Sequence, residues 1–160
     1  MLYNLTMLKV YVETTIFNRF LEENRDYYTE TGRLFEKIMK NEIEAYSSAY
    51  VIGELDKAPE PKRSNMLNTI SKYNITVLEI DQRAYDLAEI YIEMGIIPVK
   101  FRIDGVHIAM AAIHNMDCIV SLNFRHINKL KTKMATEIIH RMKEYNSPYI
   151  CTPMEVVEHE

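Results

Sequence analysis

The sequence predicts an α/β fold in which helices cover both faces of a parallel sheet. Short runs rich in β-branched and aromatic residues alternate with longer amphipathic segments along the chain. No tight hairpin turn joins two of these runs, so consecutive strands should be connected through helices and run parallel. The length of 160 residues, with 48% hydrophobic and 26% charged residues, fits one globular domain over residues 1–160.

The expected strands are short and apolar. The first, LKVYV, contains two valines and a tyrosine, which favour extended backbone. IEAYS, TVLEI and CIVSL have the same character, and a last short strand precedes Pro153. The five strands are predicted over residues 8–12, 43–47, 76–80, 118–122 and 148–152.

The expected helices show apolar residues at helical spacing, such as Leu34, Phe35 and Ile38. Gly95 and the prolines after residue 57 mark helix ends. The segment 104–115 is the most apolar and is therefore expected in the middle of the domain. Helices are predicted over residues 16–24, 31–40, 49–57, 62–72, 82–94, 104–115, 127–130 and 134–145.

Composition narrows the function class. The net charge of −4 and pI of about 5.8 argue against a surface that coats polyanions, although a local basic rim is compatible with them. Residues 1–9 lack a signal-peptide pattern, and the longest apolar stretch is too short to span a bilayer. With two cysteines and no CxxC motif, the chain is expected in the cytoplasm without a membrane anchor. Met7 is a second candidate start, which makes Met1–Thr6 a candidate extension.

Four polar residues lie where ligands bind in such a sheet, beyond the carboxyl ends of the strands. Glu13 follows the first strand, Glu54 lies in the helix after the second, Asp104 opens the apolar helix, and Asn123 follows the fourth strand. Each alone is an ordinary helix-terminal, solvated or turn residue. Together, three converging carboxylates would repel one another, and a divalent cation removes that repulsion. Oxygen ligands favour Mg²⁺ or Mn²⁺.

Other motifs add little. The chain has no P-loop, no GxGxxG and no GxSxG nucleophile elbow. His107 stands three residues after Asp104, so it is either a second side chain facing the same cleft or a histidine bonded to backbone at the edge of the core.

The chain resembles a PIN domain of the stand-alone prokaryotic toxin type, the VapC-like proteins. The resemblance covers residues 8–157 and is carried by KVYVETTIFNRF, AYVIGELDKAPEPKR, IPVKFRIDGVHIAMAAIHNMDCIVSLNFRHI and YICTPMEVV. It implies a three-layer α/β/α sandwich with a central five-stranded parallel sheet. It also implies hydrolysis of RNA phosphodiester bonds with Mg²⁺ or Mn²⁺, and an antitoxin protein as partner.

The resemblance also implies roles for individual residues. Glu13, Glu54, Asp104 and Asn123 match the metal-binding positions, and Thr15 matches a hydroxyl residue that orients the site. Two positions depart from the family pattern: Glu13 stands where Asp is usual, and the neutral Asn123 leaves three carboxylates in place of four. Three basic residues flank the third and fourth motifs: Lys100, Arg102 and Arg125. They are either contacts to the RNA backbone or solvated charges beside a helix start.

Three hypotheses follow. The first is a metal-dependent endoribonuclease, the toxin of a type II toxin–antitoxin pair. The second is a catalytically weak PIN-like module that binds RNA or protein. The third is a receiver-like or other small α/β signalling domain with an acidic Mg²⁺ pocket. It is disfavoured because the class needs a phosphorylatable Asp at the end of a central strand, whereas here the third strand runs TVLEI into Asp81 and no Lys stands where a phosphate partner is expected. A homodimer is expected in addition, through the helices over residues 31–40 and 62–72.

Overall fold

The centre of the molecule is a sheet of five parallel strands with the order β3-β2-β1-β4-β5. A computed structural model describes residues 7–159, so the candidate extension Met1–Thr6 lies outside the described residues. The predicted parallel five-stranded sheet is confirmed. The strands are β1 (Leu8–Val12), β2 (Ile43–Ser48), β3 (Thr76–Leu78), β4 (Cys118–Val120) and β5 (Tyr149–Cys151).

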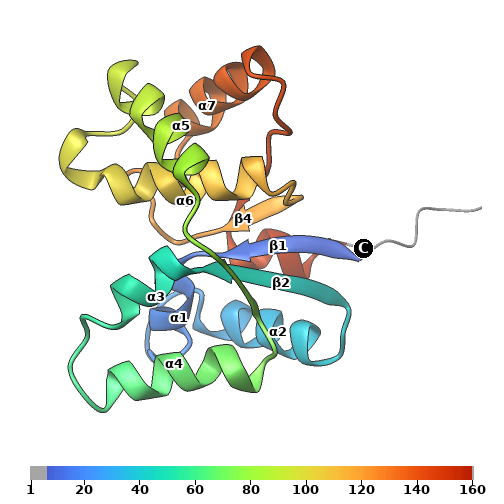
Figure 1. Ribbon diagram of the computed structural model, residues 1–160. Helices are drawn as coiled ribbons and strands as arrows, with labels where there is room; N and C mark the ends of the chain where they lie inside the picture. Colours follow the sequence, from blue (N-terminus) through green and yellow to red (C-terminus); the bar gives the residue numbers. More distant parts are fainter. Residues whose placement is uncertain (1–6, 160) are drawn as a thin grey trace, which may run out of the picture.

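Helices cover both faces of this sheet, which confirms the three-layer prediction. Figure 1 shows α5, α6 and α7 on one side of the sheet and α1, α2 and α4 on the other. The helices are α1 (Thr14–Arg19), α2 (Tyr28–Met39), α3 (Ala49–Leu55), α4 (Lys62–Lys72), α5 (Gln82–Glu93), α6 (Arg102–Ile113), α7 (Leu130–Met142) and α8 (Pro153–Val157), with a 3₁₀ turn, η1 (Val99–Phe101), before α6.

Two local predictions were wrong. The chain over residues 127–129 forms a turn in place of the predicted helix start, and a helix begins only at Leu130. In this turn the Asn123 carbonyl accepts hydrogen bonds from the amides of Ile127 and Asn128. Beyond residue 152, where no element was expected, the chain forms α8. Thr152 and Glu155 cap its first turn reciprocally.

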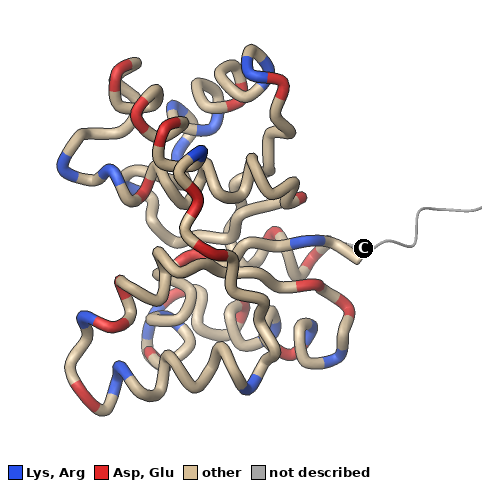
Figure 2. The backbone as a smooth tube through the Cα atoms, viewed as in Figure 1, with Lys and Arg blue, Asp and Glu red and all other residues tan. Residues whose placement is uncertain are grey.

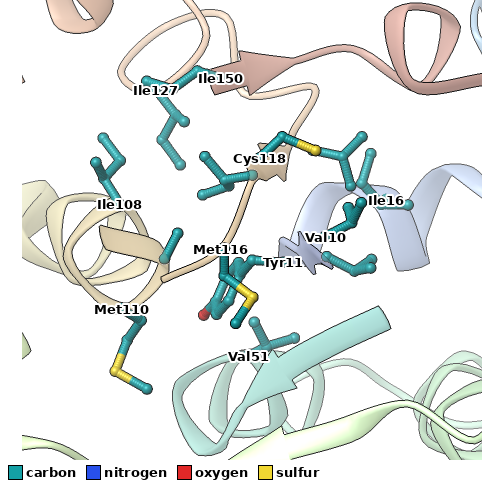
Figure 3. Packing of buried hydrophobic residues seen from close by; sticks show 14 of the residues in the cluster. Val10, Tyr11, Ile16, Val51, Ile108, Met110, Met116, Cys118, Ile127 and Ile150 are labelled. Atoms are coloured by element: carbon teal, nitrogen blue, oxygen red, sulfur yellow. The ribbon is translucent and has the colours of Figure 1, made fainter. Parts of the chain in front are cut away.

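Helix α6 lies in the middle of the molecule, as its composition predicted. Every residue from Asp104 to Ile113 is buried. Figure 3 shows Ile108 and Met110 of α6 in the same buried cluster as Tyr11 of β1 and Val51 of α3. On its other side α6 packs against α5, and the bare Cα of Gly105 allows this close approach, because a Cβ there would lie 3.3 Å from the ring of Tyr91.

The apolar faces of α2 and α4, expected to form a dimer interface, are buried in the core of the chain itself. Exposed apolar side chains lie instead along α7, where each member of one stripe is more than half exposed: Leu130, Met134, Ile138 and Met142. Within residues 7–159, no helix has the length and apolar character needed to cross a bilayer.

The strand order also locates the place where a ligand is expected. From β1 the chain proceeds to β2 and β3 on one side, whereas β4 and β5 lie on the other. The connections therefore diverge between β1 and β4, and in open parallel sheets ligands bind at the carboxyl ends of strands at such a point. Glu13 and Ser121 immediately follow these two strands.

Candidate metal and active site

Glu13 is held at the end of β1 by contacts from both neighbouring segments. Its backbone amide donates to the Val120 carbonyl of β4, at 3.2 Å. Its carboxylate Oε1 accepts from the hydroxyls of Thr15 and Ser121, each at 2.6 Å, and Oε2 accepts only a longer bond of 3.3 Å from the Thr15 amide. The residue is 2% exposed. One carboxylate oxygen is thus fixed by two hydroxyls, which leaves Oε2 as the freer ligand atom.

Thr15 connects Glu13 to the segment after β4. Its hydroxyl donates to Glu13 and accepts from the amide of Leu122 at 2.8 Å. Ser121 makes a parallel connection, since its hydroxyl donates to Glu13 and accepts from the amide of Asn123 at 3.0 Å. The orienting role that the resemblance implies for Thr15 is compatible with this geometry, and Ser121 shares it.

Glu54 approaches the site from α3. Its Oε1 accepts from the Thr14 hydroxyl at 2.6 Å and from Nε2 of His107 at 2.5 Å. One ligand atom from each of Glu13, Glu54 and His107 lies within 4.8 Å of the other two, close enough to share a metal ion. The structure therefore brings together two predicted carboxylates and one histidine.

His107 is anchored from behind by a buried chain of hydroxyls. Its Nδ1 lies 2.8 Å from the hydroxyl of Tyr11, which in turn lies 2.7 Å from the hydroxyl of Ser48. The Ser48 side chain caps the N-terminus of α3, the helix that carries Glu54. His107 is fully buried, and its ring nitrogens contact side chains: the ring joins β1, the start of α3 and the Glu54 carboxylate.

Asp104 and Asn123 lie beside this cluster without belonging to it. Asp104 is in the first turn of α6 and is 7% exposed. Its carboxylate interacts with the Asn123 amide and with the charges of Glu54 and His107. The Oδ1 atom of Asn123 accepts from the amide of His126 at 3.0 Å, which fixes the turn after β4. Asp104 is not among the three residues whose ligand atoms are mutually within 4.8 Å.

Burial and charge shift the pKa values at this site in different directions. Burial raises the pKa of Glu13 and that of Asp104, despite the opposing charge of His107. Burial also disfavours ionisation of Glu54, but the hydrogen bond and charge of His107 outweigh it and lower the pKa of Glu54. For His107, the bond to Glu54 outweighs burial and raises the pKa. Without a cation, burial therefore disfavours ionisation of two of the three acids, Glu13 and Asp104.

The donor set fits a small divalent cation. Glu13 Oε2 and Glu54 Oε2 are the carboxylate oxygens least engaged with residues 7–159, and Asp104 lies beside them. Carboxylate oxygens suit Mg²⁺ and Mn²⁺. A cation would also relieve the electrostatic cost that raises the pKa values of Glu13 and Asp104.

Sequence reasoning did not assign site roles to Tyr11, Thr14, Ser48 or Ser121, and it left His107 open. Ser121 and Tyr11 lie inside apolar strands, where nothing in the local pattern separates a site residue from a core residue. The sequence did contain one signal for His107, namely its spacing of one helical turn from Asp104.

Three basic residues flank the third and fourth sequence motifs: Lys100, Arg102 and Arg125. Figure 2 shows Lys and Arg positions along the segment that leads into α6. Arg102 pairs with Glu89 of α5, so its charge is already neutralised. Lys100 and Arg125 instead lie 5.8 and 5.6 Å from the ring centre of Phe101. A cavity of about 740 Å³ lies away from the candidate site, at the amino ends of β1 and β4. None of the predicted site residues lines it.

The fold is that of solved VapC-type structures. The chain matches the crystal structure of VapBC2 from Rickettsia felis, bound to a DNA fragment from their promoter, with a TM-score of 0.58, 15% identity, and coverage of 91% of this chain and 98% of that one. The chain has a PIN-like fold. At this identity the similarity establishes the fold alone, and it confirms the VapC-like resemblance at that level.

A second match is VapC20 of Mycobacterium tuberculosis, a toxin that cleaves the sarcin-ricin loop, with a TM-score of 0.47, 13% identity, and coverage of 69% of this chain and 86% of that one. No protein-family model and no curated protein sequence matches this chain. The PIN-like strand order β3-β2-β1-β4-β5 also differs from the 2-1-3-4-5 order of receiver-like domains, which excludes the receiver-like form of the third hypothesis.

Proposed function

We propose that this protein is a Mg²⁺- or Mn²⁺-dependent endoribonuclease and the toxin of a type II toxin–antitoxin pair. The observation that carries the proposal is the placement of Glu13, Glu54 and His107 within 4.8 Å of one another, with Asp104 beside them, where the connections from β1 and β4 diverge. Buried carboxylates converging on one ligand-binding edge have no evident structural benefit, because they repel one another.

Each side chain has a separate role in the proposed reaction. A bound ion would supply Lewis-acid polarisation of the phosphate and a more acidic water. Glu13, Glu54 and Asp104 would hold it, and the Asn123 amide would hold a water beside Asp104. Thr15 and Ser121 fix the orientation of Glu13.

His107 keeps Glu54 ionised and in place. Its Nε2 bonds to the Glu54 carboxylate, and the charge and bond together lower the pKa of that acid. The burial of this imidazole excludes water from the back of the site.

The partner assignment is supported by VapBC2. That assembly was crystallised with promoter DNA, and a chain of the same fold is expected to pair with a small DNA-binding antitoxin. Co-expression with the product of the adjacent open reading frame, followed by size-exclusion chromatography, tests this: a stable complex that suppresses RNA cleavage is expected. Action on cellular RNA places the protein in the cytoplasm.

Self-association and domain organisation are parts of the same proposal. We infer that residues 1–160 act as one domain and that two copies form a symmetric dimer, supported by the exposed apolar stripe of α7. Light scattering at tens of micromolar should give twice the 18.9 kDa mass of one chain. A single-chain mass would refute the dimer and leave the nuclease proposal intact.

Cleavage of single-stranded RNA is the decisive test. The purified protein should cut a mixed RNA pool with Mg²⁺ or Mn²⁺, and EDTA should stop it. Asn123→Asp restores a fourth carboxylate and keeps the oxygen that accepts from His126, so it should keep or raise Mn²⁺-dependent cleavage, and Glu13→Asp likewise. Asn123→Ala should cost less activity than Asp104→Asn, because solvent replaces part of a water-holding role.

The alternative is a PIN-like module that binds RNA or protein with little catalysis. Two observations favour it: Asn123 supplies no charge, and the Glu54 Oε1 atom is already bonded to Thr14 and His107. Protein that binds RNA but stays inert with both ions, even after Asn123→Asp and Glu13→Asp, would establish this alternative.

A further inference from the structure

His126 has a buried nitrogen without a partner. The residue is 8% exposed, and within residues 7–159 its Nε2 atom has no hydrogen-bond partner. The ring is held in place on one side by Phe101, at a centroid distance of 4.2 Å. An unpaired buried donor costs free energy, about 1–3 kcal/mol. A fixed ring with an unused nitrogen therefore points to a ligand that the protein does not itself supply.

A cavity adjoins this ring. It has a volume of about 520 Å³ and lies between the end of α5, the segment before α6, and the turn after β4. Apolar residues such as Ile97 and Val99 form one wall. The polar wall is entirely basic, formed by Arg125, His126, Lys129 and Lys131.

The basic groups of this cavity have little to neutralise them. No ion pair found within residues 7–159 involves Arg125, Lys129 or Lys131. Lys131 donates only to the carbonyl of Gly95, at 3.3 Å, across the cavity rim. In a chain with a net charge of −4, such a concentration of unpaired cations indicates an anionic ligand.

The turn after β4 connects the cavity to the candidate site. His126 lines the cavity and follows Asn123 by three residues. The Asn123 turn bonds to the backbone amide of the same histidine. An anion in the cavity would therefore lie against the turn that also carries Asn123, the neighbour of Asp104.

We propose that Arg125, His126, Lys129 and Lys131 form a subsite for a backbone phosphate of the RNA strand, next to the phosphate that is cleaved. With its proton on Nε2, His126 donates one hydrogen bond to a phosphate oxygen. Arg125 offers the planar fork that matches a phosphate, and Lys129 adds a point charge. The subsite rests on the proposed ribonuclease function and gives it a direction of substrate binding, from the α6 cleft towards the end of α5.

Binding without cleavage tests this subsite separately from catalysis. The full chain is titrated against a fluorescein-labelled single-stranded RNA in EDTA, with anisotropy measured at several salt concentrations. Arg125→Gln and Lys129→Gln should each weaken binding about three- to tenfold and reduce the salt slope by about 0.7. Lys40→Gln is the matched control. This exposed lysine precedes the amino end of β2, whereas the subsite follows the carboxyl end of β4, so the change should alter neither quantity.

His126→Phe is the sharpest variant. Phenylalanine keeps the ring against Phe101 and removes the unpaired nitrogen, so the melting temperature should stay equal or rise while RNA affinity falls about threefold or more. A merely structural histidine would give the opposite pattern, lower stability with unchanged affinity, and that result would overturn the subsite.

The remaining outcomes distinguish the source of the anion and the two proposals. Wild-type RNA binding that Arg125→Gln and Lys129→Gln leave unchanged would overturn the subsite, even if inorganic phosphate shifts the His126 ring signals in an NMR titration. Such a shift would then mark a free-phosphate site. Wild-type protein that binds no RNA would overturn the ribonuclease proposal itself. Weakened binding by both variants in a protein that never cleaves would support the subsite and the non-catalytic alternative.

Discussion

His107 on α6 and His140 on α7 are both buried, and each imidazole lies between two oxygen atoms. His107 contacts the Tyr11 hydroxyl and the Glu54 carboxylate. His140 contacts the Tyr91 hydroxyl through Nε2 and the Ser147 hydroxyl through Nδ1, the latter at 2.9 Å. The pKa of His107 is raised, whereas burial lowers the pKa of His140 to about 4.

The difference between these histidines lies in the charge of one partner. Burial opposes protonation of both rings, and only His107 has a carboxylate to outweigh it. The neutral His140 ring connects α7 to α5 and to the segment before β5. His107 belongs to a charged cluster at the ligand-binding edge. The comparison shows that the charge of a partner side chain distinguishes the candidate site from a contact in the core, whereas burial does not.

The largest expected effect is on the rate of RNA cleavage, which should fall for a change at Asp104 and not for a change at His140. Asp104→Asn, at the charged end, should lower RNA cleavage by about 100- to 1,000-fold, because it removes a metal-holding charge. His140→Gln should leave the cleavage rate within about twofold. Asp86→Asn on the exposed face of α5 controls for loss of a carboxylate, and the readout is initial rate with Mn²⁺. Equal loss in Asp104→Asn and Asp86→Asn would contradict the site.

The second effect is on stability against pH. Between pH 6.5 and 4 the unfolded chain protonates His140 and the folded chain does not, so the unfolded state binds more protons and stability falls as pH falls. The loss should approach ~3 kcal/mol over this window at about 1.4 kcal/mol per unit. Urea unfolding in EDTA measures it. His140→Gln should flatten the slope, and an unchanged slope would show that other groups cause it.

The third prediction tests whether hydrogen bonds or packing hold His107 in place. His107→Phe should lower the free energy of unfolding by ~2 kcal/mol at pH 7, because the buried Tyr11 hydroxyl and the Glu54 carboxylate each lose a partner. His107→Gln should recover part of this loss, since its amide can still donate to Glu54. Denaturant titration measures both variants. Greater stability in the Phe variant than in the Gln variant would mean that packing, and not the polar bonds, holds this position.

The smallest effect is stabilisation by metal. Mn²⁺ at ten times its dissociation constant should stabilise the folded state by ~1.4 kcal/mol and raise the melting temperature by a few degrees. Glu13→Gln and Asp104→Asn should abolish the rise, whereas His140→Gln should keep it. If the first two variants respond like the parent protein, the ion binds elsewhere.

The elements that the sequence predicted correctly are those encoded within a few residues. Alternating valine and tyrosine predicted β1, and the unbroken apolar run over residues 104–115 predicted the central position of α6. The reciprocal cap of α8, formed by Thr152 and Glu155, was also readable from spacing alone and was missed. The helix expected over residues 127–130 is a turn up to Lys129, because the Asn123 side chain accepts from the His126 amide and so offers the backbone a competing bond.

The sequence by itself determined the fold class, and through the resemblance it named Glu13, Glu54, Asp104 and Asn123 as a set. Only the tertiary structure decided which groups touch. The bond from Ser121 to Glu13 spans 108 positions, and that from Tyr11 to His107 spans 96. Secondary structure follows from backbone and side-chain preferences of neighbouring residues, so a pattern carries it. Contacts across such separations exist only once β1, β4 and α6 have packed, and that packing is what placed a charged partner beside His107 and neutral ones beside His140.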